Sequence, residues 1–115
     1  MTSADYLQTE FQELGIPMDL HGYKQCLLSV ELAVKNEDRL LSITKQIYQE
    51  VAEECGCKTA CIERNIRTII FRAWKNAPEH MNELAKRPLG APPSVSEFIS
   101  ILTANALRQT DKNSD

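Results

Sequence analysis

The apolar residues of this chain recur at intervals of three and four along every long segment, and no segment alternates like a half-buried strand. Such spacing places apolar side chains on one face of an α-helix, so the sequence predicts an all-α fold. The expected helices cover residues 3–14, 22–36, 41–55, 59–75, 77–86 and 95–108. We therefore expect a compact domain of about six helices.

Residues that favour helix ends separate these segments. Gly56 is placed to end the third expected helix, because glycine readily adopts the left-handed conformation found there. Thr59 is a good N-cap residue for the fourth helix, and Pro78 suits the first turn of the fifth. Ser94 and Glu97 have the spacing of a capping box, in which each side chain binds the other residue's backbone amide.

The 115 residues suit one domain, which we assign to residues 1–109, and we expect residues 110–115 to form a disordered tail.

Charge is distributed unevenly along the chain. The net charge of −3 by itself argues against nucleic-acid binding, since nucleic-acid-binding domains are usually basic. Residues 58–75, however, contain five basic residues and one acidic residue, whereas residues 1–57 contain four basic and ten acidic residues. Positive charge is therefore concentrated in the fourth expected helix.

Residues from about 42 to 75 have the pattern of a helix-turn-helix. Ala52 is small enough to let a second helix cross closely, and Gly56 permits a sharp turn. In DNA-binding proteins with this motif, the second helix enters the major groove. We predict that residues 59–75 form that recognition helix.

The predicted recognition helix carries its charges opposite an apolar stripe made of Ile62, Ile66, Ile69, Ile70, Ala73 and Trp74. Arg64 and Arg67 lie near its amino end and can pair with guanine, while Glu63 can accept from the cytosine amino group, so we predict that these residues read bases. A second set fits contacts with phosphates, which position a protein without reading sequence: Lys58, Thr59, Arg72 and Lys75. The alternative is a basic face that is merely solvated. Because this basic face lies on the second helix of a predicted helix-turn-helix, DNA binding is favoured over that alternative.

At these residues the sequence resembles the C-terminal DNA-binding domain family of the master sporulation response regulator of endospore-forming bacteria. The similar stretches span about residues 11–108 and read FQELGIPMDLHGY, SITKQIYQEVAEECG, IERNIRTIIFRAW and SEFISILTANALR. The resemblance implies a six-helix fold of the winged-helix-like, response-regulator effector type that binds promoter DNA in a sequence-specific way. It also implies a homodimer on DNA, RNA polymerase as a partner, and a cytoplasmic, nucleoid-associated location. Glu63, Arg64 and Arg67 match the family's recognition-helix charges.

The sequence departs from the family pattern at Ala60, Cys61, Thr68 and Phe71, and two of these positions favour an alternative function. Cys61 stands where the family typically has a basic residue, and Phe71 projects to the polar side of the helix. The alternative is a protein-interaction module of the same fold that has lost specific DNA binding and acts on a regulator or on RNA polymerase. Phe71 would then contact a partner. Two other possibilities are that it contacts a DNA sugar or thymine methyl, or that it packs under the fifth helix. We also expect no receiver domain, because the chain has no room for one.

The remaining reactive residues carry weaker signals. Cys55, Cys57 and Cys61 can supply thiolates for zinc, but their spacing lacks the usual pairs, so we expect no metal and no cofactor. We recognise no arrangement of nucleophile and base and no glycine-rich phosphate loop, and so expect no enzyme. No apolar run approaches the length of a membrane span, and we expect no membrane partner.

Overall fold

A computed structural model of the chain describes residues 2–113, with side chains described for residues 2–109. Its α-helices are α1 (Ser3–Glu13), α2 (His21–Lys35), α3 (Gln49–Cys55), α4 (Thr59–Asn76), α5 (Pro78–Ala85) and α6 (Val95–Asn113). A 3₁₀-helix, η1 (Glu37–Ser42), and a π-helix, η2 (Thr44–Tyr48), precede α3. No strand occurs between residues 2 and 113, so the predicted all-α class is confirmed. Within that range there is also no β-hairpin that could form the wing of a winged helix.

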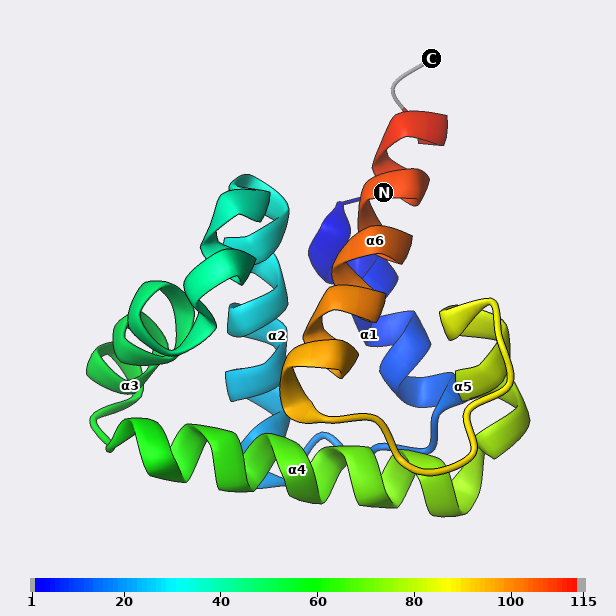
Figure 1. Cartoon of the computed structure of the whole chain (residues 1–115), viewed down its shortest axis with the longest axis horizontal. Helices are drawn as coiled ribbons and strands as arrows, with labels where there is room; N and C mark the ends of the chain where they lie inside the picture. The colour runs from blue at the N-terminus through cyan, green and yellow to red at the C-terminus, as the bar shows by residue number, and fades with distance from the viewer. Residues whose placement is uncertain (1, 114–115) are drawn as a thin grey trace.

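The other helices gather on one side of α4. In Figure 1, α4 lies along the bottom of the molecule, with α3 near one end, α5 at the other, and α1, α2 and α6 above it. Helix α2 packs against both α4 and α6, and α1 packs against α2 and α6. One long face of α4 is therefore turned toward the protein and the other away from it.

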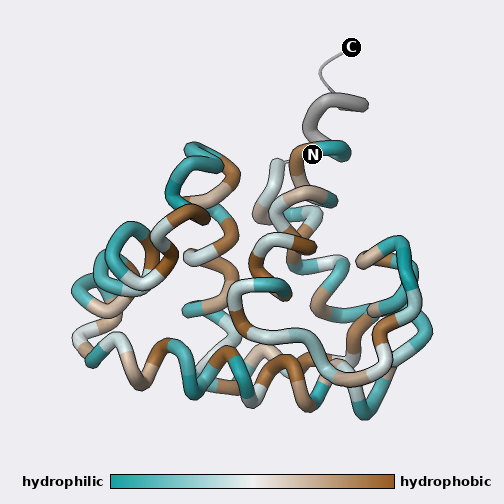
Figure 2. The backbone as a smooth tube through the Cα atoms, viewed as in Figure 1, coloured by the Kyte–Doolittle hydropathy of each residue, from teal (hydrophilic) through white to brown (hydrophobic). Residues whose placement is uncertain are grey.

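Apolar residues from every α-helix form a continuous core. Phe11 of α1, Val30 of α2, Ile66 of α4 and Phe98 of α6 are almost completely buried. The rings of Phe11 and Tyr23 meet edge to face, with their centroids 5.0 Å apart. Figure 2 shows hydrophobic and hydrophilic stretches alternating along the helices, as amphipathic helices require.

The segment expected as one helix over residues 41–55 begins earlier and changes its winding. It starts as a 3₁₀-helix at Glu37 and passes through a π-helical turn before α3. Its apolar residues recur at steps of four, whereas an α-helix has 3.6 residues per turn. A π-helix, with its i→i+5 hydrogen bonds, holds more residues per turn and keeps such a pattern on one face. Ile47 and Val51 are accordingly both fully buried.

The helix caps differ in part from the prediction. Lys58, rather than Thr59, is the N-cap of α4, because Lys58 keeps an extended backbone and Thr59 is already helical. At the start of α6, the Ser94 hydroxyl accepts from the Glu97 amide at 3.2 Å. The Glu97 carboxylate forms an ion pair with Arg87. One half of the predicted capping box is thus formed.

The last helix is longer than the sequence predicted. Helix α6 ends at Asn113, whereas we expected its end near residue 108 and a disordered tail from residue 110. Residues 109–113 contain no glycine or proline, so nothing in their backbone chemistry interrupts the helix. The end of the expected tail, residues 114–115, lies outside the described residues.

Polar contacts tie α1 to the segment where α4 ends and α5 begins. The Asn76 side chain donates to the Gly15 carbonyl at 2.9 Å. His80 of α5 lies against Glu10 of α1, with Nε2 and Oε2 2.8 Å apart. Burial lowers the pKa of His80, but the hydrogen bond and charge of Glu10, with neighbouring carboxylates, raise it above its ordinary value overall. This contact therefore stabilises positive charge.

Candidate nucleic-acid interface

Helix α4 buries an apolar face and exposes a polar one. The buried residues are those predicted for its apolar stripe: Ile62, Ile66, Ile69, Ile70 and Ala73, with Trp74 half-buried. The exposed residues are Ala60, Arg64, Arg67, Thr68, Phe71, Arg72, Lys75 and Asn76. The helix thus anchors itself with isoleucines while its charged side chains remain free to meet a ligand.

A tight turn sets the direction in which α4 leaves α3. Gly56 has a φ of 69°, in the left-handed region that glycine adopts without strain. The Cys57 amide donates to the Ala52 carbonyl at 2.9 Å and so closes the end of α3. Ala52 itself is buried. This helix, turn and helix occupy the segment in which the sequence predicted a helix-turn-helix.

Helix α2 fixes the position of α4 through a short chain of polar contacts. The Asn65 amide donates to Gln25 Oε1 at 3.0 Å, and Gln25 Nε2 donates to Cys57 Sγ at 3.8 Å. Gln25 is a buried polar residue, so both its ends need partners. Sequence reasoning missed this contact, because no spacing rule relates residues 32 and 40 positions apart.

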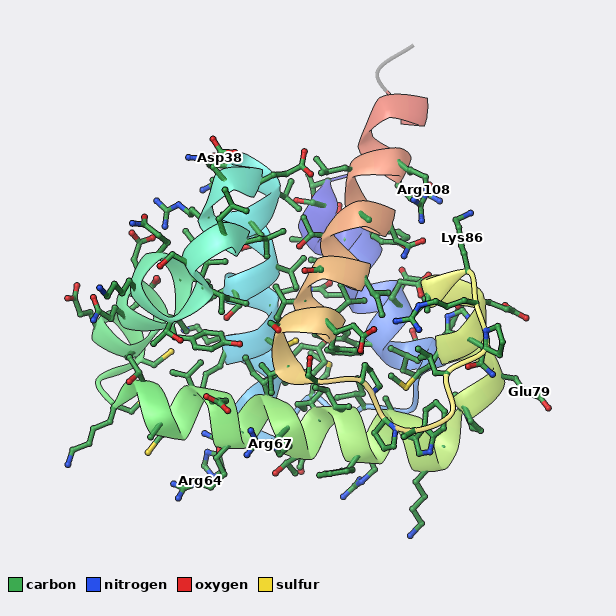
Figure 3. All side chains as sticks on the ribbon, viewed as in Figure 1. Asp38, Arg64, Arg67, Glu79, Lys86 and Arg108 are labelled. Carbon is green, nitrogen blue, oxygen red and sulfur yellow. The ribbon has the colours of Figure 1, made fainter. Side chains whose placement is uncertain are left out.

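The three predicted base-reading residues lie together on α4. Figure 3 shows Arg64 projecting from α4 away from the other helices, and Arg67 lies on the flank of α4 beside η2 and the start of α6. The Arg67 guanidinium donates to Glu63 Oε1 at 2.5 Å, and Arg64 donates to Cys61 Sγ at 3.4 Å. The Arg67 side chain nevertheless remains 52% exposed. Its pairing with Glu63 follows from their i,i+4 spacing, which was visible in the sequence.

The predicted phosphate-contacting residues lie along the same helix. Lys58, Arg72 and Lys75 are exposed, and Thr59 is half-buried. Among the described side chains, Arg67 has an ion-pair partner, whereas Lys58, Arg64, Arg72 and Lys75 have none. Four of the five cations on this segment are therefore not neutralised by the protein itself.

Comparison with known families accounts for this combination of fold and charge. Residues 7–106 match the family described as "Sporulation initiation factor Spo0A C terminal", which covers nearly the whole chain. The chain belongs to this family. This family consists of DNA-binding domains of sporulation transcription factors, and it is not a family of enzymes. In residues 2–113 of this Spo0A C-terminal domain, no helix is both long and apolar enough to cross a bilayer.

A hollow of about 340 Å³ borders the exposed face of α4 in this Spo0A C-terminal domain. Tyr48 of η2, Arg67 and Phe71 of α4, and the residues at the start of α6 line it. Phe71 is 55% exposed, so the alternative in which it packs under α5 is wrong. The sequence placed Phe71 on the polar side of the helix correctly but could not locate the hollow beside it.

The cysteines of the Spo0A C-terminal domain serve different local contacts. Cys57 accepts from Gln25 and Cys61 accepts from Arg64. Burial, followed by the charge of Cys57, raises the pKa of the Cys55 thiol, which disfavours a thiolate there. The three sulfurs of Cys55, Cys57 and Cys61 form no group close enough to share an ion within the described part of the chain.

Proposed function

We propose that the domain binds double-stranded promoter DNA with the exposed face of α4 in the major groove. The observation that carries this proposal is the set of unneutralised cations on α4, combined with the family membership. The acidic remainder of the chain is repelled by phosphates, so the contact is confined to this face. A domain with net charge −3 then has a small DNA footprint and weak non-specific binding.

Base reading falls to Arg64, Arg67 and Glu63. An arginine fork matches O6 and N7 of guanine, and a carboxylate accepts from the cytosine amino group. Because Glu63 already holds Arg67, the two side chains approach DNA as a pre-oriented pair, which lowers the conformational entropy lost on binding. Arg64 would break only its hydrogen bond to the Cys61 sulfur, which is a weak acceptor, when it binds a base.

Phosphate contacts fall to Lys58, Thr59, Arg72 and Lys75, which extend from the N-cap to the last turn of α4. Each lysine or arginine that neutralises a phosphate releases counterions and strengthens binding to any sequence. These residues thus position the domain, and the three base-reading residues select its site.

The resemblance to the family implies a homodimer on DNA. We propose that two copies bind side by side, with both α4 helices facing the same duplex. We place this complex in the bacterial cytoplasm, on the nucleoid, with RNA polymerase as the downstream partner.

Fluorescence anisotropy with promoter and random duplexes tests the roles assigned to α4. Arg64→Ala should cost about 1–3 kcal/mol on a cognate site and little on random DNA. Lys75→Ala should weaken binding to both duplexes by a similar factor. If both variants bind promoter DNA like the parent chain, α4 is not the groove-facing helix.

The exposed Phe71 favours a second function. A half-exposed aromatic residue between basic side chains is typical of a protein contact, and a hollow lies beside it. The domain would then act on a regulator or on RNA polymerase without specific DNA binding. Absence of duplex binding even at low salt would favour this function over the first.

A further inference from the structure

The contact between α1 and α5 gathers an imidazole and carboxylates around one point. His80 Nε2 lies 2.8 Å from Glu10 Oε2 and 3.1 Å from Glu13 Oε2. One ligand atom from each of these residues lies within 4.8 Å of the others. We propose that Glu10, Glu13 and His80 bind a divalent transition-metal ion, with Zn²⁺ as the best fit, and that the ion links α1 to α5.

The donor set suits such an ion chemically and geometrically. Zinc accepts imidazole nitrogen and carboxylate oxygen at about 2.0–2.2 Å, usually in a tetrahedral shell. Ligand atoms in that shell lie about 3.4 Å apart, so His80 Nε2 needs to move away from the two glutamate oxygens by only about 0.3–0.6 Å. The fourth position remains for water, and the 54% exposed side chain of Glu13 leaves a path from solvent.

The second nitrogen of the imidazole also has a partner. His80 Nδ1 lies 3.5 Å from Glu83 Oε2, one helical turn further along α5. A carboxylate on the far nitrogen is the common arrangement behind metal-bound histidines, where it fixes the ring and increases its basicity. Glu83 is therefore a positioning residue in this proposal.

The balance of charge favours a divalent cation over a proton alone. Three carboxylates surround a single imidazole, so a protonated His80 leaves two negative charges uncompensated within the cluster. Glu10 is only 8% exposed, and a buried carboxylate is costly unless it is paired. A divalent ion that displaces the imidazole proton would lower this excess from two negative charges to one, independently of any DNA contact made by α4.

Calorimetric titration of the metal-free full chain with ZnCl₂ tests the proposal. Free thiols can also take up zinc, so the titration is repeated in a Cys55→Ser, Cys57→Ser, Cys61→Ser chain to exclude zinc held by the cysteines. We expect one ion per chain in both backgrounds. Glu13→Gln should weaken binding at least tenfold, because it removes a ligand, whereas Glu79→Gln removes an equal charge from the exposed surface of α5 and should leave binding unchanged.

A thermal melt of the same variants provides the second readout. Added ZnCl₂ should raise the Tm of the parent and Glu79→Gln chains but not that of the Glu13→Gln chain. The Glu13 side chain is exposed, so we expect Glu13→Gln to fold like the parent chain, which circular dichroism verifies. Three outcomes overturn the proposal: no binding at millimolar zinc, binding that disappears in the triple serine chain, or equal loss in Glu13→Gln and Glu79→Gln.

Discussion

Gly22→Ala tests how closely α2 must approach α4. A Cβ atom on Gly22 would lie 2.4 Å from the carbonyl oxygen of Asn65 and 2.8 Å from Cγ1 of Ile69. Ordinary contacts of this kind begin near 3.4 Å, so α2 and α4 must separate by about 1 Å at this crossing. The oxygen belongs to the backbone in the middle of α4 and cannot rotate away as a side chain can.

The expected cost follows from two opposing effects. Overpacking of a close crossing costs about 1–3 kcal/mol, and a backbone obstacle places this site at the upper end. Alanine is the better helix former, which returns at most about 1 kcal/mol near the start of α2. We therefore expect Gly22→Ala to lower the free energy of unfolding by about 2 kcal/mol and the Tm by about 8 °C.

Urea unfolding followed by circular dichroism measures this difference. Gly90→Ala is the matched control, because a Cβ atom there meets nothing within 4 Å and its stability should change by less than about 0.5 kcal/mol. Equal stability of the two variants would refute the close crossing of α2 over α4, and with it the way in which α2 positions the candidate interface.

Three further predictions concern α4 and its turn. Gly56→Ala should lower the free energy of unfolding by about 1–2 kcal/mol in urea titrations, because its φ of 69° strains any residue with a Cβ atom; an unchanged midpoint would contradict the left-handed turn. Glu63→Gln should reduce the preference for cytosine at one position of the site more than it reduces affinity for the promoter, as measured by anisotropy on sites with single base-pair changes. A uniform loss of affinity on all of these sites would argue against base reading by Glu63. Phe71→Ser should leave stability within about 0.5 kcal/mol, since this ring is half-exposed, and a larger loss would mean that the ring supports the core.

Much of the fold could be predicted from the spacing of apolar residues. The stripe on α4 was predicted residue by residue, because a regular amphipathic helix repeats every 3.6 residues. The π-helical turn in η2 was not, since a step of four between Ile43, Ile47 and Val51 fits either winding until tertiary packing decides. Helix ends were the other weakness: Lys58 caps α4 and α6 runs on to Asn113, because local preferences differ little at such positions.

The candidate interface was predictable where it depends on one helix and not where it depends on two. Charge and periodicity placed Arg64 and Arg67 on an exposed face, and both lie there. The contact from Asn65 through Gln25 to Cys57 joins separate helices, as does the cluster around His80. Such contacts form only when the helices pack together, so no local sequence pattern predicts them.

The salt dependence of promoter binding tests the central claim most directly. If Lys58, Arg72 and Lys75 each neutralise one phosphate, the logarithm of the association constant should fall against the logarithm of salt concentration with a slope of about −3. Lys75→Ala should make this slope shallower by about one, whereas Arg64→Ala should lower affinity for the promoter with a smaller change in slope. A slope near zero, or no binding to promoter DNA at about 50 mM salt, would contradict the assignment of α4 as the DNA-binding surface.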